Sequence, residues 1–127
     1  MLIEKDNTVS VWMGNLTEAQ LAEYVIDEDI ETDGPLNKFA SDMGEYYYDS
    51  ELLGGNLLAA PVPTAELLRP LAYAETYSDA VVTAADKLGI KAANCVVTLL
   101  RQELQIEEWP TDSPLTFIGS FELQKLS

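Results

Sequence analysis

The chain of 127 residues contains no histidine and a single cysteine, Cys95. The lack of histidine excludes His-based acid–base catalysis, Ser–His triads and ordinary zinc catalysis. One cysteine cannot form an internal disulfide, which fits a reducing compartment. Because Cys95 lies in an apolar stretch without a basic neighbour, we interpret it as a small buried hydrophobic residue rather than as a nucleophile.

Basic residues and long apolar runs are also scarce. The sequence has 7 Lys and Arg residues against 22 Asp and Glu residues, which gives a net charge of −15. Such a field repels nucleic acid and anionic lipid, and it attracts cations and basic proteins. The first residues lack the apolar run of a signal peptide, and no stretch approaches the ~18 apolar residues that span a membrane. We therefore expect a cytoplasmic protein that binds neither nucleic acid nor membrane.

Motifs for catalysis are missing as well. The glycine pair at 54–55 has neither the GKS/T ending of a phosphate loop nor the GxGxxG spacing of a dinucleotide site. Paired carboxylates could serve a glycosidase, but acids are so abundant here that pairs arise by chance. We predict a protein that is not an enzyme and that holds no cofactor and no metal.

Hydrophobic residues make up 47% of the chain and extend along its whole length, which predicts one domain over residues 1–127. Four segments carry helix signals. Thr17 is an N-cap with Gln20 as its capping-box partner, and Leu16 and Leu21 take the two positions of a hydrophobic staple. The other helical segments are recognised by apolar spacing and by the residue that ends each: 36–43 before Gly44, 64–68 before Pro70, and 76–88 before Gly89.

Strand signals come from alternation and from β-branched residues. Residues 8–13 predict a strand with Val9, Val11 and Met13 on one face, and 94–100 read as a central strand covered on both faces. Residues 115–123 alternate as a half-buried strand, antiparallel to its neighbour through the 101–114 connection. Residues 46–63 predict one short strand that is interrupted at the glycine pair and ended by prolines. The fold class is α+β: a small, mostly antiparallel sheet of three to four strands, with three to four helices packed mainly on one face.

The segment DEDIETDG, residues 27–34, resembles a calcium-binding loop in part. An EF-hand loop that started at Asp29 would place Asp29, Glu31 and Asp33 at positions 1, 3 and 5, with Gly34 at position 6. Position 12 is Ala40, so the bidentate carboxylate that such a loop requires is missing. A cation- or calcium-binding module therefore stays an alternative to the interpretation that follows.

The same segment begins a longer acidic region that contains aromatic residues. Its acids are opposed only by Lys38, and they are Asp27, Glu28, Asp29, Glu31, Asp33, Asp42, Glu45, Asp49 and Glu51. Tyr46, Tyr47 and Tyr48 lie among them. Tyrosine is enriched at protein interfaces, and free acids steer association, so this region is a candidate partner-binding face. The alternative is that one or two tyrosines face the core and the acids are merely solvated.

Two segments resemble the immunity protein 22 family. VSVWMGNLTEAQLAEYV, residues 9–25, is similar to the family's opening, in which a strand with a Trp-x-Gly motif leads into a helix with a tyrosine near its end. In this chain the motif is Trp12-Met13-Gly14, and the tyrosine is Tyr24. FIGSFEL, residues 117–123, resembles the closing strand and contains Gly119 and Phe121. The middle segment, residues 39–53, has a similar short helix and aromatic-acidic turn.

The resemblance implies a bacterial immunity protein, the antidote to the toxin domain of a polymorphic toxin system. It implies no catalytic residue, and it gives the motif residues structural roles. The acidic region 27–51 would then cover the toxin's substrate-binding cleft; a basic nuclease is one candidate for the toxin. We expect the protein to be a monomer or a weak homodimer. A small adaptor protein without a toxin partner is the other alternative.

Overall fold

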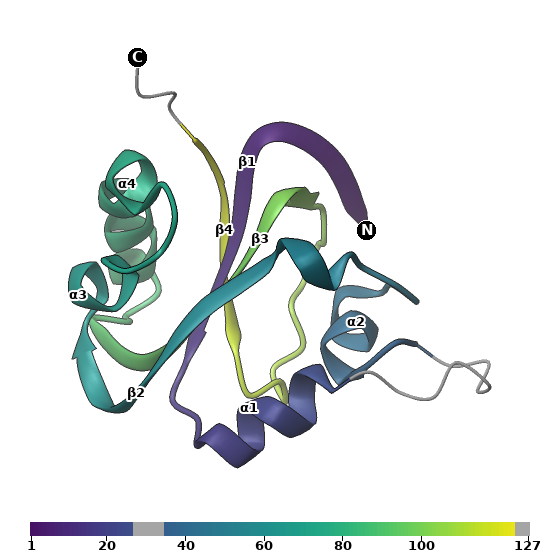
Figure 1. The fold of residues 1–127 in the computed structure, drawn as a ribbon, viewed down its shortest axis with the longest axis horizontal. Helices are drawn as coiled ribbons and strands as arrows, with labels where there is room; N and C mark the ends of the chain where they lie inside the picture. The colour runs from purple at the N-terminus through teal and green to yellow at the C-terminus, as the bar shows by residue number, and fades with distance from the viewer. Residues whose placement is uncertain (27–34, 124–127) are drawn as a thin grey trace.

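A four-stranded sheet forms the centre of the computed structural model, which describes residues 1–26 and 35–123 (Figure 1). These residues also form four α-helices and one 3-10 turn. In chain order the elements are β1 (Leu2–Gly14), α1 (Glu18–Val25), α2 (Lys38–Met43), η1 (Ser50–Leu52), β2 (Leu53–Pro63), α3 (Thr64–Leu68), α4 (Ala74–Lys87), β3 (Ala92–Leu104) and β4 (Thr116–Glu122). The predicted α+β class is confirmed.

The strands are ordered β2-β3-β1-β4, and every neighbouring pair is antiparallel. Because β1 pairs with both β3 and β4, those two strands run in the same direction on either side of it. The expectation that residues 115–123 run antiparallel to the preceding strand through the 101–114 connection is therefore wrong: β4 pairs antiparallel with β1, not with β3. The connection after β3 crosses to the other side of β1 instead of closing a hairpin.

Helices cover both faces of the sheet, so the expectation that they pack mainly on one face is wrong (Figure 1). Val9, Val11 and Met13 point to the face covered by α3 and α4. Trp12 and Val97 point to the opposite face, which α1 and α2 cover. The physical reason is that β1 and β3 are apolar on both faces, and both faces must be removed from water. Within the described residues, no helix has the length and apolar character needed to cross a membrane.

The local helix signals are confirmed. The Thr17 side chain accepts a hydrogen bond from the Gln20 backbone N–H at 3.1 Å, and the Gln20 side chain accepts one from the Thr17 N–H at 2.8 Å. Gly44 ends α2 at φ +78°, and Gly89 follows α4 at φ +80°. Both are left-handed conformations that glycine adopts without a steric penalty.

β2 corrects the prediction about residues 46–63. The strand runs without a break from Leu53 to Pro63 and therefore includes both the glycine pair and the prolines. It lies at the edge of the sheet, where a proline need not donate to a second neighbour, and its register against β3 shifts between Leu57 and Val62. A side chain at Gly55 would overlap the carbonyl oxygen of Val96, so glycine is what lets β2 approach β3 there.

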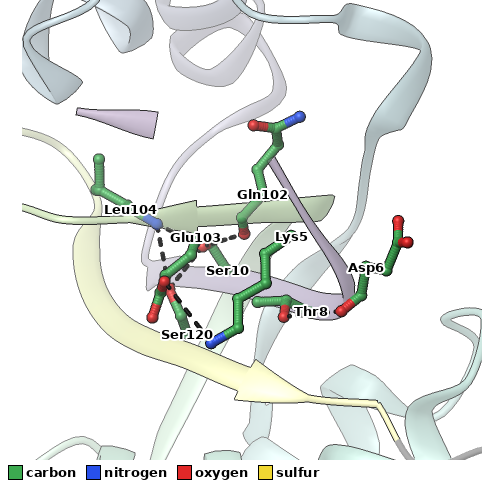
Figure 2. Close-up of polar contacts among 8 residues, drawn as sticks. All are labelled: Lys5, Asp6, Thr8, Ser10, Gln102, Glu103, Leu104 and Ser120. Carbon is green, nitrogen blue, oxygen red and sulfur yellow. Dashed lines mark hydrogen bonds and ion pairs between the residues drawn. The ribbon is translucent and has the colours of Figure 1, made fainter. Parts of the chain in front are cut away.

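β1 is longer than predicted because it continues through an irregularity in its pairing with β3. Its register against β3 shifts between Glu4 and Val9, and Arg101 lies opposite at φ +63°. Figure 2 shows how side chains complete the hydrogen bonding at this irregularity. The Ser10 hydroxyl lies 2.8 Å from both the Gln102 carbonyl and the Ser120 hydroxyl, and the Leu104 N–H donates to Ser10 Oγ at 3.2 Å. Buried hydroxyls thus replace ladder bonds where three strands meet.

Candidate functional site

The predicted partner-binding face is only partly within the described residues. Asp27, Glu28, Asp29, Glu31 and Asp33 lie outside them, and so do residues 29–34, the first half of the calcium loop that was considered as an alternative. The described part of the region comprises Asp42, Glu45, Tyr46, Tyr47, Tyr48, Asp49 and Glu51. These residues divide into a group that holds the fold together and a group that points outward.

Two of the acids bind other parts of the protein. The Tyr24 hydroxyl donates to Asp42 Oδ2 at 2.5 Å, and Lys38 Nζ lies 4.0 Å from Asp42 Oδ1. Glu45 Oε1 accepts a hydrogen bond from the Leu2 backbone N–H at 2.6 Å. These carboxylates therefore connect α2 and the residues that follow it to α1 and to the start of β1.

Tyr48 belongs to the core. Its side chain is 3% exposed, and its ring centroid lies 5.5 Å from that of Phe39. The Asn37 side-chain amide donates to the Tyr48 hydroxyl at 2.8 Å and to the Val25 carbonyl at 3.1 Å. Tyr48 thus fixes the segment that follows α2 against the end of α1, which agrees with the alternative that one tyrosine of the three faces inward.

Tyr46 and Tyr47 point outward, with side chains 71% and 67% exposed. The Tyr46 carbonyl accepts a hydrogen bond from the Leu36 N–H at 2.7 Å, which holds this turn in place. Asp49 Oδ1 accepts one from the Glu51 N–H at 3.0 Å, and the Glu51 side chain is exposed. We call Tyr46, Tyr47, Asp49 and Glu51 the tyrosine–acid surface.

The family-motif residues lie in the sheet and in the core that packs against it. Trp12 is fully buried, with its ring centroid 4.7 Å from that of Phe39. A side chain at Gly14 would come within 2.6 Å of the Pro114 carbonyl oxygen. Gly119 has φ +151°, and the half-buried ring of Phe121 packs against it. Trp12 thus packs in the layer under α1 and α2, whereas Phe121 packs against the cluster on the other face of the sheet.

Tyr24 and Tyr77 are buried tyrosines in opposite hydrogen-bonding situations. Tyr24 lies near Asp42, to which it donates, and 2.9 Å from the Ser113 hydroxyl; burial and the bond to Asp42 raise the pKa of Tyr24 far above its ordinary value. Tyr77 lies on α4 and packs in the core cluster that this helix forms with the sheet, and its hydroxyl has no hydrogen-bond partner among the described residues. Burial raises the pKa of Tyr77 to about 12.

This contrast predicts that replacing each tyrosine by phenylalanine has a different effect on the free energy of unfolding at neutral pH. Tyr24→Phe should lower the free energy of unfolding by about 1–3 kcal/mol, because half-buried Asp42 loses its donor. Tyr77→Phe should be neutral or stabilising, because it removes a buried hydroxyl without a partner. Urea denaturation of each variant measures both changes. A Tyr77→Phe loss as large as that of Tyr24→Phe would contradict the assignment.

The raised pKa of Tyr77 also predicts the behaviour at alkaline pH. The unfolded tyrosine loses its proton near pH 10 while the folded one keeps it, so stability falls as pH rises from about 10 to about 12. Tyr77→Phe should make that fall shallower. An unchanged slope in this variant would show that other groups cause the alkaline loss.

A groove of about 300 Å³ lies between α1 and β2 and was not anticipated from the sequence. Its lining is mostly apolar: Leu21, Val25, Leu53, Gly54, Gly55, Asn56, Leu57, Val96 and Val97. The glycine pair did not signal the groove, because the space that a side chain at Gly54 or Gly55 would take is filled by Thr98 and Val96 of β3. Recognising the groove required the position of α1 over β2, which is a matter of tertiary packing.

A protein-family model matches most of the chain, including the segments that carry the resemblance. The protein-family model described as Immunity protein 22 matches residues 9–124. The chain belongs to this family. The match confirms the resemblance seen at both ends of the chain and extends it across the middle. No match was found among curated proteins or among solved structures. Membership of an immunity-protein family supports a toxin-immunity role, implies a toxin as the partner and points to a non-catalytic protein.

Proposed function

We propose that this immunity protein binds the toxin domain of a polymorphic toxin system in the cytoplasm and blocks its active site with the acidic region 27–51. The tyrosine–acid surface carries the proposal. Two adjacent tyrosines that are each about two-thirds exposed offer a large contact area, and the turn that presents them is fixed by a backbone hydrogen bond. Tyrosine anchors of this kind lose little side-chain entropy when a partner covers them.

Charge supports a basic partner. Between Gly14 and Arg69 the only basic residue is Lys38, and its ammonium group already faces Asp42. All other charged residues of this stretch are acidic, so it attracts a positively charged cleft over distances of about 8–10 Å at moderate salt. A nuclease cleft that binds phosphates has that charge. Covering the cleft would exclude the substrate without any catalytic group on the immunity protein.

The test is binding to the toxin domain encoded beside the gene, measured by titration calorimetry and by inhibition of that toxin. Tyr46→Ala/Tyr47→Ala should raise Kd by at least about tenfold, since interface tyrosines often contribute 1–2 kcal/mol each. The matched control is Tyr73→Ala, which removes an exposed tyrosine at the start of α4, outside the acidic region. Wild-type binding should also weaken as salt rises.

Other outcomes would contradict the proposal in identifiable ways. Equal affinities for the double variant and the Tyr73→Ala control would place the contact elsewhere on the protein. A stoichiometric calcium titration without any toxin binding would favour the cation-binding alternative. Toxin binding that leaves toxin activity intact would retain the partner and reject the blocking mechanism.

A further inference from the structure

The outer edge of β2 is open along residues 53–57. β2 is the first strand of the sheet order, so in the described part of the chain no strand pairs with its outer side. Natural edge strands are usually protected by proline, charge or a covering element. Pro61 and Pro63 protect the second half of β2, whereas the first half, Leu-Gly-Gly-Asn-Leu, contains neither a proline nor a charge.

The groove lies over this same half of the strand. Side chains alternate along a strand, so Leu53, Gly55 and Leu57 share one face. That face is the one covered by α1, because Leu53 and Leu57 pack with the cluster around Trp12. Gly55 lies between the two leucines and supplies no side chain, while Leu21 and Val25 of α1 form the opposite wall. An apolar hollow is therefore built directly beside the unpaired backbone.

We propose that an extended segment of the toxin domain adds as a strand to residues 53–57 of β2 and inserts an apolar side chain into the groove. This inference rests on the proposed function, because it takes the toxin as the partner. Strand addition uses main-chain hydrogen bonds for affinity and a pocket for a side chain that faces the sheet for specificity. The open edge of β2 supplies the main-chain hydrogen bonds, and the groove supplies the side-chain pocket.

The charges around the groove indicate that the toxin segment that binds there is basic. Exposed carboxylates flank the groove in the sequence: Glu18 and Glu23 on α1, and Glu51 just before β2. The added segment should therefore carry Lys or Arg next to its apolar residue. The tyrosine–acid surface continues through η1 into Leu53, so one partner could cover both. A second copy of this chain is disfavoured as the occupant, because each copy carries a net charge of −15.

The first measurement is amide hydrogen exchange of the wild-type protein, free and in complex with the toxin domain encoded beside its gene. In an antiparallel edge strand, alternate amides face away from the sheet. In the complex, the alternate amides of residues 53–57 that do not bond to β3 should exchange at least about tenfold more slowly. This measurement needs no substitution, so it does not depend on a variant that folds.

The second measurement fills the groove. Val25→Phe enlarges a half-buried residue that lines the groove and should raise Kd for the toxin domain by at least about tenfold. Val82→Phe makes the same change at a half-buried position of α4, in the layer on the other face of the sheet, and should leave Kd unchanged. Matched melting curves establish that both variants are folded.

The outcomes separate this inference from the proposed function. A tight wild-type complex with unprotected amides at 53–57 and normal binding by Val25→Phe overturns the inference and leaves the proposed function standing. Failure of the wild-type protein to bind the toxin domain overturns both. Protection of these amides that rises with the concentration of the free protein assigns the edge to a second copy of the chain and overturns the inference.

Discussion

Replacing Trp12 by alanine is expected to lower the free energy of unfolding by about 3–5 kcal/mol, a large share of the stability of a domain of this size. Trp12 is fully buried on β1, the strand that pairs with both β3 and β4. Its ring centroid lies 4.7 Å from that of Phe39 and 5.3 Å from that of Phe117. Removing the indole would leave a cavity between the sheet and α2 that these rings cannot close by small movements.

Trp109→Ala is the matched control in the same aromatic cluster. The Trp109 ring lies 6.0 Å from that of Trp12, but its side chain is only half-buried, and its indole N–H donates to the Leu115 carbonyl at 2.7 Å. Its loss should therefore cost less. Trp12→Phe should cost less than Trp12→Ala, because it refills part of the cavity and removes an indole N–H that has no partner among the described residues.

Urea denaturation followed by circular dichroism measures the three stabilities. The tryptophan signal itself would be altered by each substitution and is not suitable as the readout. A Trp12→Ala loss no larger than that of Trp109→Ala would show that the core on this face tolerates the cavity. It would also remove the packing explanation for the tryptophan of the Trp-x-Gly motif.

The elements predicted well from the sequence are those determined by neighbouring residues. The start of α1 depends on Thr17 and Gln20, and the ends of α2 and α4 depend on Gly44 and Gly89. Each signal acts within one turn of helix, so no knowledge of the tertiary fold is needed. The family resemblance rests on the same kind of local pattern, a buried strand followed by a capped helix.

The elements predicted poorly depend on where a segment lies in the sheet. Pro61 and Pro63 would interrupt a central strand, but β2 lies at the edge and tolerates them. The two-sided burial of 94–100 was recognised from its composition, yet the number of helices on each face was not. That number follows from which strands pair with β1, and such pairing involves residues far apart in the sequence.

The candidate site shows the same division. Composition pointed to a tyrosine-rich acidic region as the candidate site, but it could not say which side chains point outward. Tyr47 and Tyr48 are adjacent and differ from 67% to 3% exposed, because Asn37 and Phe39 of the preceding helix segment hold Tyr48. Asp42 and Glu45 are likewise engaged by Tyr24 and by the start of β1. These contacts exist only once the chain has folded.

Asn94→Ala is expected to lower the free energy of unfolding by about 2–4 kcal/mol, although it removes no apolar contact area of consequence. The Asn94 side chain lies buried at the start of β3 and bonds to two other elements. Its Oδ1 accepts from the Leu16 N–H at 2.8 Å, and its Nδ2 donates to the Leu16 carbonyl at 2.6 Å and to the Leu58 carbonyl at 3.0 Å. One side chain thus supplies hydrogen-bond partners to backbone groups of the turn before α1 and of the outer strand β2.

Asn56→Ala is the control, because Asn56 lies in the adjacent strand, is half-buried, and makes a single side-chain bond to the Leu67 carbonyl at 3.0 Å. Its loss should cost about 0.5–1.5 kcal/mol. Asn94→Asp separates the roles of the two side-chain ends: it keeps an acceptor for the Leu16 N–H but places a carboxylate against two carbonyls, so it should destabilise at neutral pH and recover partly in acid. If Asn94→Ala costs no more than Asn56→Ala, the corner between β1, β2 and β3 is held by apolar packing alone, and the position of α1 over the groove does not depend on this amide.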